Sequence, residues 1–261
     1  MKLSAKQVAL VSVFAALIVI VTRLPGIPIA IGKGTGSIEL SAPLYPLAGI
    51  LLGPFVGAIA VLIGNFIAWL IPTSTMLGLL LVPAGAVAAL ISGFLMKRAR
   101  WISWKLAAVV FAVLNTLWYL TPAGWEAPFY PIPLHFTALA LILVFRHKIV
   151  DFVESQSRRF VTIGIALATF IGTMAEHMTG NLLYISALGI LVDLKTIRDS
   201  LRAIGMVWAK MGVPLPEPTV GDFFMVFLPI AAVERIAFTA IATVIGVAVI
   251  RIIGRSRLLK T

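Results

Sequence analysis

Long apolar runs separated by short polar loops make up most of this chain, and they predict membrane-spanning helices. The first run, residues 5–22, is about as long as a helix must be to cross the hydrocarbon core of a bilayer. The other runs are 40–52, 55–71, 76–96, 106–120, 134–145, 160–180 and 223–250. We therefore predict an all-α, polytopic integral membrane bundle of about eight spans, which forms a single membrane domain over residues 1–261.

The stretch 39–71 differs from the other runs because Gly53 and Pro54 interrupt it. Pro54 cannot donate a helical hydrogen bond, and it disfavours the α region for the residue before it. Gly49, Gly53 and Gly57 are spaced four apart, so on a helix they would share a face that a neighbouring backbone can approach closely. We predict two short helices that meet at Gly53-Pro54, with a single kinked helix as the alternative.

Composition supports a membrane protein and argues against other classes. The chain is 61% hydrophobic and 12% charged, whereas soluble domains carry about 25% charged residues. The net charge of +11 does not indicate nucleic-acid binding, because the basic residues lie in short loops between apolar runs. The absence of cysteine excludes disulfides and thiolate metal ligands.

The placement of Lys and Arg predicts how the chain is oriented. Basic residues gather in the N-terminal tail, in 97–105, in 146–159 and in the C-terminal tail. Cytoplasmic loops are enriched in such residues, so these segments and both termini should be cytoplasmic. The path from an outer loop at 23–39 to the inner loop at 97–105 requires an odd number of crossings, which favours two helices within 40–71.

Polar and aromatic side chains gather at the predicted outer ends of the spans and in the outer loops. Trp and Tyr are common at any membrane interface, but Asn and Glu within spans are rarer and more often functional. We interpret the set as an outward-facing pocket for a small molecule. Its candidate ligand-binding residues are Lys33, Glu39, Asn65, Trp69, Asn115, Tyr119, Glu176, His177 and Asn181.

Glu234 and Arg235 place charge near the middle of the last span. Neighbours on a helix point about 100° apart, so the two should not pair easily with each other, although Arg235 could reach Glu176. They form either a structural ion pair or, in a self-sufficient secondary transporter or channel, an ion or proton relay.

A third possibility is an intramembrane enzyme with a metal bound by His135, Glu176 and His177. The motifs HExxH and GxSxG are absent, and Glu176 and His177 diverge on a helix because they are adjacent. We therefore predict no enzyme, no metal and no cofactor.

Two further helical faces have distinctive patterns. Residues 194–211 alternate apolar positions at threes and fours with charged residues on the other side, which is typical of an amphipathic helix in the outer membrane interface. Within the first run, small residues are spaced by four, three and four at Ala5, Ala9, Ser12 and Ala16. Such a face can pack tightly against a helix of this chain or of another.

Roughly the first hundred residues resemble the S components of energy-coupling factor (ECF) transporters. The resemblance rests on the Ala-rich first run (Ala5, Ala9, Ala15, Ala16), on the long outer loop ending in Ser37-Ile38-Glu39-Leu40, and on the sequence PLAGILLGPFVGA at 46–58. It implies high-affinity capture of a small vitamin-like molecule at the outer face of the plasma membrane. Lys33 and Glu39 would then belong to a gating loop over the site.

The resemblance also implies partners. The small-residue face of the first run would dock onto a transmembrane coupling subunit that two cytoplasmic ATPases drive. Members of this family usually have six spans. The S-component-like helices would therefore occupy 1–145, and 146–261 would contain additional helices together with the amphipathic segment.

Overall fold

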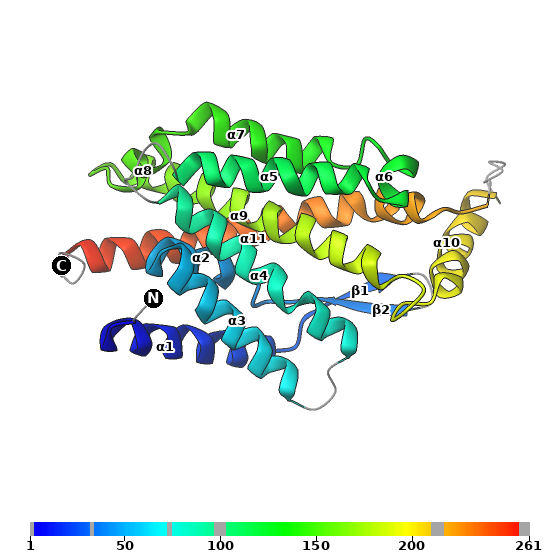
Figure 1. Ribbon diagram of the computed structural model, residues 1–261, viewed down its shortest axis with the longest axis horizontal. Coiled ribbons are helices and arrows are strands. Elements are labelled where there is room, and N and C mark those ends of the chain that lie inside the picture. Colours follow the sequence, from blue (N-terminus) through cyan, green and yellow to red (C-terminus); the bar gives the residue numbers. More distant parts are fainter. Residues whose placement is uncertain (1–2, 32–33, 72–74, 97–102, 210–216, 256–261) are drawn as a thin grey trace.

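The computed structural model describes residues 3–31, 34–71, 75–96, 103–209 and 217–255. These residues form a bundle whose helices run along its long axis, which confirms the predicted helical membrane architecture (Figure 1). In chain order the helices are α1 (Ala5–Thr22), α2 (Leu44–Leu52), α3 (Pro54–Leu70), α4 (Met76–Leu95), α5 (Ser103–Tyr119), α6 (Pro122–Glu126), the π-helix η1 (Ile132–Phe136), α7 (Thr137–Phe145), α8 (Lys148–Val153), α9 (Arg158–Ala187), α10 (Leu194–Ala209) and α11 (Val220–Arg255).

The helices differ in how fully they can cross a bilayer. Within the described residues, α1, α4, α9 and α11 are long and apolar enough to do so. The other predicted spans correspond to shorter helices, of which α2 has only nine residues. Helix α9 also continues to Ala187, past the end predicted at Gly180, because an isolated glycine does not stop a helix that packs along its length.

The break at Gly53-Pro54 separates two helices, as predicted. Gly53 has φ +85°, in the left-handed region that side chains with a Cβ avoid, and Pro54 occupies the first position of α3, where no N–H is needed. A Cβ at Gly57 would lie 2.6 Å from the carbonyl oxygen of Ala48, so α2 and α3 pack backbone to backbone. The alternative of one kinked helix is wrong.

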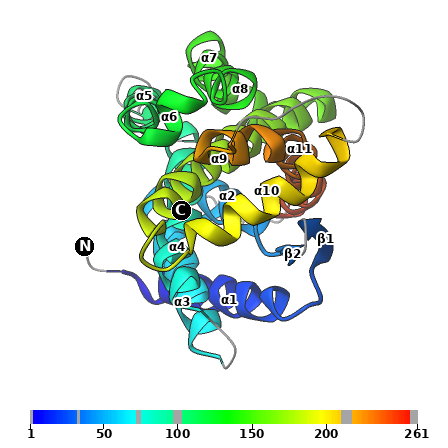
Figure 2. The ribbon, with the colours of Figure 1, turned by 90° about the vertical axis from the view of Figure 1, so that its right-hand side faces the viewer.

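The loops fall at two ends of the bundle in the predicted order. Helix α1 begins and α11 ends at the left of Figure 1, where the junction of α2 with α3, the end of α4, the beginning of α5 and the segment from α7 to α9 also lie. The positive-inside pattern assigns this end to the cytoplasm. The opposite, outer end is crossed by α10, which buries Ile197 and Leu201 and exposes charged side chains, as its amphipathic pattern predicts (Figure 2).

A β-hairpin within the outer loop adds to the predicted helices. Strand β1 (Ile27–Ile31) pairs antiparallel with β2 (Gly34–Ile38), with Ile27 opposite Ile38. The hairpin follows α1 and leads to α2 at the outer end of the bundle (Figure 2). Lys33, a predicted ligand residue, lies outside the described residues.

Helices α4 and α9 form the centre of the bundle. One buried cluster joins them to α5, η1, α7 and α11 and contains Phe111, Trp118, Ile142 and Met174. A second packs α1, α2, α3 and α4 around Tyr45. Residues of both clusters, including Tyr45 and Phe224, line a cavity.

Candidate functional site

A cavity of about 730 Å³ occupies the outer half of the bundle. Its walls come from the outer ends of α1, α3, α4 and α11, the beginning of α2 and the C-terminal part of α9. Six predicted ligand residues lie on it: Glu39, Asn65, Trp69, Glu176, His177 and Asn181. Residues far apart in the sequence therefore meet at one site, as the topology predicts.

Two predicted ligand residues lie elsewhere. Asn115 is 3% exposed in the core beside Trp118, and neither of its side-chain polar atoms has a hydrogen-bond partner within the described part of the chain. The Tyr119 hydroxyl donates to the carbonyl of Pro128 at 2.9 Å. Both residues belong to α5, which packs on the far side of α9 and contributes nothing to the cavity wall, so this part of the prediction is corrected.

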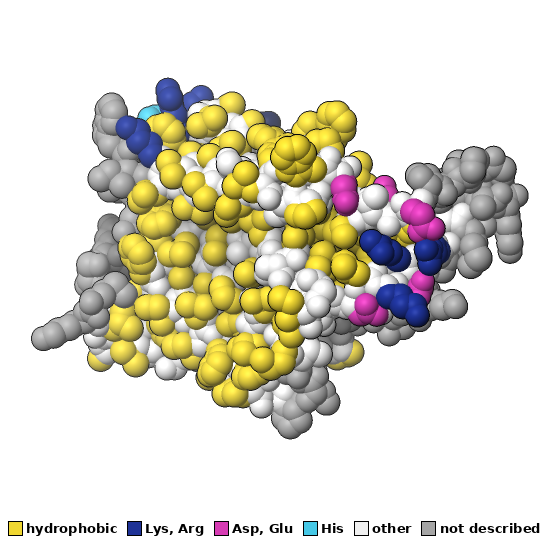
Figure 3. Space-filling model, turned by 45° about the vertical axis from the view of Figure 1, so that its right-hand side comes forward, with side chains coloured by type: hydrophobic (Ala, Val, Ile, Leu, Met, Phe, Trp, Pro, Cys, Tyr) yellow, Lys and Arg dark blue, Asp and Glu magenta, His cyan; other side chains and the backbone are white. Residues whose placement is uncertain are grey.

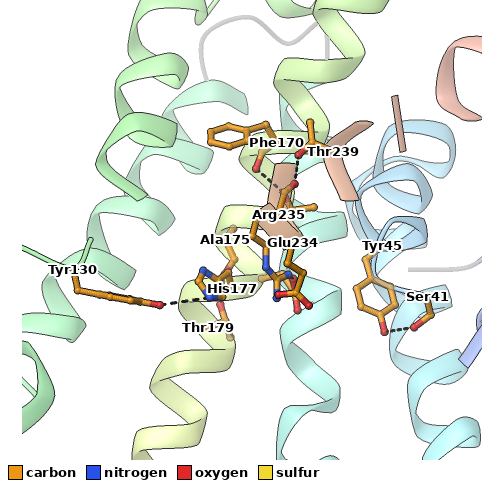
Figure 4. A network of polar contacts seen from close by, with 12 residues as sticks. Ser41, Tyr45, Tyr130, Phe170, Ala175, His177, Thr179, Glu234, Arg235 and Thr239 are labelled. Carbon is orange, nitrogen blue, oxygen red and sulfur yellow. Dashed lines mark hydrogen bonds and ion pairs between the residues drawn. The ribbon is translucent and has the colours of Figure 1, made fainter. Parts of the chain in front are cut away.

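One wall of the cavity is a chain of hydrogen bonds from α1 to α2. Thr22 Oγ1 donates to Glu39 Oε1 at 3.2 Å, and Ser41 Oγ donates to the same oxygen at 2.8 Å. Ser41 is in turn 2.9 Å from the Tyr45 hydroxyl (Figure 4). Arg23 donates to the carbonyl of Ala68, so the outer end of α1 is tied to both α2 and α3.

A cluster of intramembrane charges forms the floor of the cavity. Arg235 pairs with Glu176 through one guanidinium nitrogen. Its second guanidinium nitrogen is 3.3 Å from Glu234 Oε2, and Figure 4 shows these two neighbours of α11 side by side. The side chains are only 10%, 16% and 17% exposed for Arg235, Glu176 and Glu234, respectively. The expectation that Glu234 and Arg235 do not pair easily is wrong, because the long arginine side chain reaches its neighbour's carboxylate while it also binds Glu176.

A second polar group lies where α9 meets Tyr130. Asn181 Nδ2 donates to the Tyr130 hydroxyl at 2.9 Å, and His177 Nε2 lies 3.5 Å from the same hydroxyl. Burial raises the pKa of Tyr130 to about 12, so its hydroxyl stays protonated at neutral pH. The ring stacks on Trp118 at 4.6 Å between centroids, which fixes the hydroxyl at the cavity wall.

The arrangement does not support the metal-site hypothesis. His135 and His177 stack with ring centroids 5.2 Å apart and an interplanar angle of 19°, so their nitrogens do not converge on one point. Among the described residues there is no group of three or more His, Cys, Asp or Glu that could hold a metal ion. Glu176 is instead paired with Arg235.

The outer wall is aromatic, and sequence reasoning missed it. Tyr184 of α9 stacks on Phe223 of α11 at 5.7 Å and 10°, and Phe224 and Phe227 continue the wall. Flat aromatic faces provide a large contact area for a planar ligand. The signal in the sequence is the aromatic series at 223, 224 and 227, but aromatic residues are common at membrane interfaces, so the series alone does not indicate a ligand site.

A membrane bundle with a mixed aromatic and charged cavity at its outer end has the architecture of a small-molecule binding or transport protein. Residues 2–130 match the family described as "ECF-type riboflavin transporter, S component". This match assigns residues 2–130, just under half of the chain, to the S components of ECF transporters. Members of this family are membrane-embedded transporter subunits that capture vitamin-type substrates and work with ECF membrane and ATPase subunits.

Other similarities are more distant. The chain is 28% identical over 178 residues to "Uncharacterized protein MJ0923" of Methanocaldococcus jannaschii. The matched region covers 64% of this chain and 58% of that protein. The matched region therefore spans little more than half the length of that relative. No solved structure matches the chain.

Proposed function

We propose that this protein captures a small vitamin-like molecule with high affinity at the outer face of the plasma membrane and delivers it to an ECF complex for ATP-driven uptake. The observation that carries the proposal is the cavity of about 730 Å³, which combines an aromatic wall with buried polar and charged groups. Ligand sites of this kind are concave, largely apolar and carry a few placed polar groups.

The chemistry of the cavity suits the riboflavin named in the family description. A planar heterocycle would stack against Tyr184 and Phe223, and hydroxyl groups would find partners in Asn65, Asn181 and Glu39. Carboxylates accept and amides both donate and accept hydrogen bonds, so this set can satisfy several hydroxyls at once.

The outward face of α1 supports docking to a coupling subunit. Ala5, Ala9, Ser12 and Ala16 are all exposed, whereas Ala15 and other residues on the opposite face are buried. A face of small residues allows a helix of another subunit to approach closely. The energy for uptake would come from the ATPases of the complex.

The first experiment is to purify the protein alone in detergent and to identify any co-purifying molecule by mass spectrometry, followed by titration with riboflavin monitored by flavin fluorescence. A flavin bound at near one-to-one ratio supports the proposal and its ligand. A different vitamin-like molecule supports capture but replaces riboflavin. A protein that binds none of these molecules contradicts high-affinity capture.

A self-sufficient secondary transporter is the second candidate function, favoured by the placement of Glu176 and Arg235 inside the membrane and on the cavity wall. Ionisable residues in such positions often mark ion or proton pathways. Proteoliposomes that contain this chain alone distinguish the two functions. Flux driven by a proton gradient would favour the transporter, whereas uptake only after addition of the ECF subunits and ATP would favour capture.

A further inference from the structure

We propose that the cytoplasmic end of the protein binds the phosphate group of an anionic phospholipid at a site built around Trp104. Trp104 lies at the start of α5, and Arg146 and His147 join α7 to α8 at the same end of the bundle (Figure 1). Figure 3 shows Lys and Arg side chains gathered at this end around a histidine. The site is remote from the ligand cavity and does not depend on the function proposed for it.

Two basic side chains lie against the Trp104 indole ring. The Arg146 guanidinium carbon lies 5.6 Å from the ring centroid and Lys105 Nζ lies 5.9 Å from it, both within the range of a cation–π interaction. The ring of His147 meets the indole edge-on, with centroids 5.8 Å apart. These contacts position cationic groups beside one indole instead of leaving them spread through solvent.

The site also has an unused hydrogen-bond donor. The indole N–H of Trp104 is buried and has no hydrogen-bond partner among the residues that the structure describes. An indole nitrogen can only donate, so the group that satisfies it must be an acceptor. Trp104 borders a small hollow with Arg146, His147 and Val150, and no carboxylate within the described part of the chain lies in ion-pair distance of Arg146.

An anion with several oxygens meets these requirements together. A phosphate diester can accept from the indole N–H through one oxygen and from the Arg146 guanidinium through another, and hydrogen bonds between ionised groups are stronger than neutral ones. The hollow is about 10 Å³, room for one water-sized group, so a single phosphate oxygen would enter it and the rest of the head group would stay outside.

The surroundings favour a phospholipid over a free phosphate ion. Exposed apolar side chains continue from the site along the lipid-facing surface: Leu106 and Val109 on α5, and Leu143 and Val144 on α7, which are 40%, 58%, 49% and 67% exposed. Acyl chains can lie along this surface, whereas inorganic phosphate gains nothing from it. Basic pockets between helices on the cytoplasmic side are typical binding places for anionic head groups.

Lipid titration of the full-length protein, monitored by native mass spectrometry, tests the site. The protein is delipidated in detergent and titrated with phosphatidylglycerol or phosphatidylcholine. Trp104→Phe keeps the ring and every charge but removes the N–H. We expect about tenfold weaker phosphatidylglycerol binding in this variant, the scale for a hydrogen bond to a charged group. Arg146→Gln should weaken it about fivefold, the scale for one basic residue near an anionic lipid.

Three comparisons decide the outcome. Arg198→Gln removes an exposed charge from α10 at the opposite end and should leave phosphatidylglycerol binding unchanged. If Trp104→Phe binds phosphatidylglycerol as the wild type does, diffuse electrostatic attraction explains the binding and the site is refuted. If inorganic phosphate at millimolar concentration displaces the lipid, the source is a free anion and the lipid assignment is refuted. Arg146→Lys, which keeps the charge but loses the planar fork, replaces Trp104→Phe if that variant does not fold, and should also weaken binding.

Discussion

Replacing Gly180 by leucine tests most directly whether the cavity binds the ligand. Gly180 lies inside α9 on the cavity wall, and a Cβ built on it meets no atom within 4 Å. The Cβ of the new side chain therefore meets open space, and the rest of the leucine would occupy part of the cavity. Because glycine inside a helix costs about 0.8–1.0 kcal/mol relative to alanine, we expect the variant to be at least as stable as the wild type.

The effect on binding should have the opposite sign. A ligand would have to share the cavity with the leucine side chain, and overpacking a filled site costs about 1–3 kcal/mol. Since 1.4 kcal/mol is a factor of ten, this corresponds to a roughly 5- to 150-fold higher dissociation constant. Gly180→Ala adds only one carbon atom and should have a smaller effect on binding while it stabilises the helix.

The assay is a fluorescence titration with riboflavin, or with whichever ligand co-purifies, next to a thermal unfolding curve in the same detergent. Ser186→Leu, on an exposed position of the same helix, is the matched control and should leave binding unchanged. Gly85→Ala is the contrasting variant, since its Cβ would lie 2.8 Å from the Tyr45 ring and 2.9 Å from the Asn65 amide, and it should weaken both stability and binding. A folded Gly180→Leu protein with wild-type affinity would refute the cavity as the ligand site.

Other perturbations address the charge cluster, the docking face and the topology. Arg235→Leu should lower the free energy of unfolding by about 3–5 kcal/mol because it leaves two buried carboxylates without a cation. Glu176→Gln should lower it by only about 1–3 kcal/mol because the arginine keeps its other partner, Glu234. Equal unfolding free energies of the two variants would contradict this order. Ala9→Trp should abolish uptake by the complete transporter yet leave ligand binding by the isolated protein intact, and lost binding would point to misfolding instead. Because the chain has no cysteine, single variants Trp125→Cys and Gln156→Cys can be labelled with an impermeant thiol reagent in intact cells, and only the former should react before lysis.

Local chemistry made part of the fold predictable from the sequence. The Gly53-Pro54 break follows from the missing N–H of Pro54 and from the left-handed conformation that glycine accepts, and both act within a few residues. The bounds of α1 are those predicted, because an apolar run ends there in a polar and proline-containing loop. The Ser4 side chain also caps this helix through the N–H of Gln7, which strengthens its start.

The rotation of each helix about its axis was much less predictable, and it decides which side chains line the cavity. Asn65 and Asn115 are both asparagines near the outer end of a predicted span, yet only Asn65 lines the cavity. Their difference depends on packing between helices distant in the sequence. The pairing of Arg235 with Glu176, 59 residues away, could be proposed from the chemistry of intramembrane charges, but the simultaneous contact with Glu234 required the geometry of the arginine side chain.

The residues proposed to bind the partner and many of the residues that line the cavity come from different parts of the chain. The proposed docking face lies on α1, inside the region that matches the S-component family, and the matched region also supplies Tyr45 and Asn65 to the cavity. The charges at the floor and the aromatic wall, including Glu176, Phe223 and Arg235, come from residues beyond 130. Under the proposed function, proteins that share only the first half of this chain would dock to the same kind of coupling subunit and still bind different molecules. Under the proposed function, substitutions on the cavity wall in α9 and α11 should change which ligand is bound. Substitutions on the small-residue face of α1 should change only the delivery of the ligand to the coupling subunit.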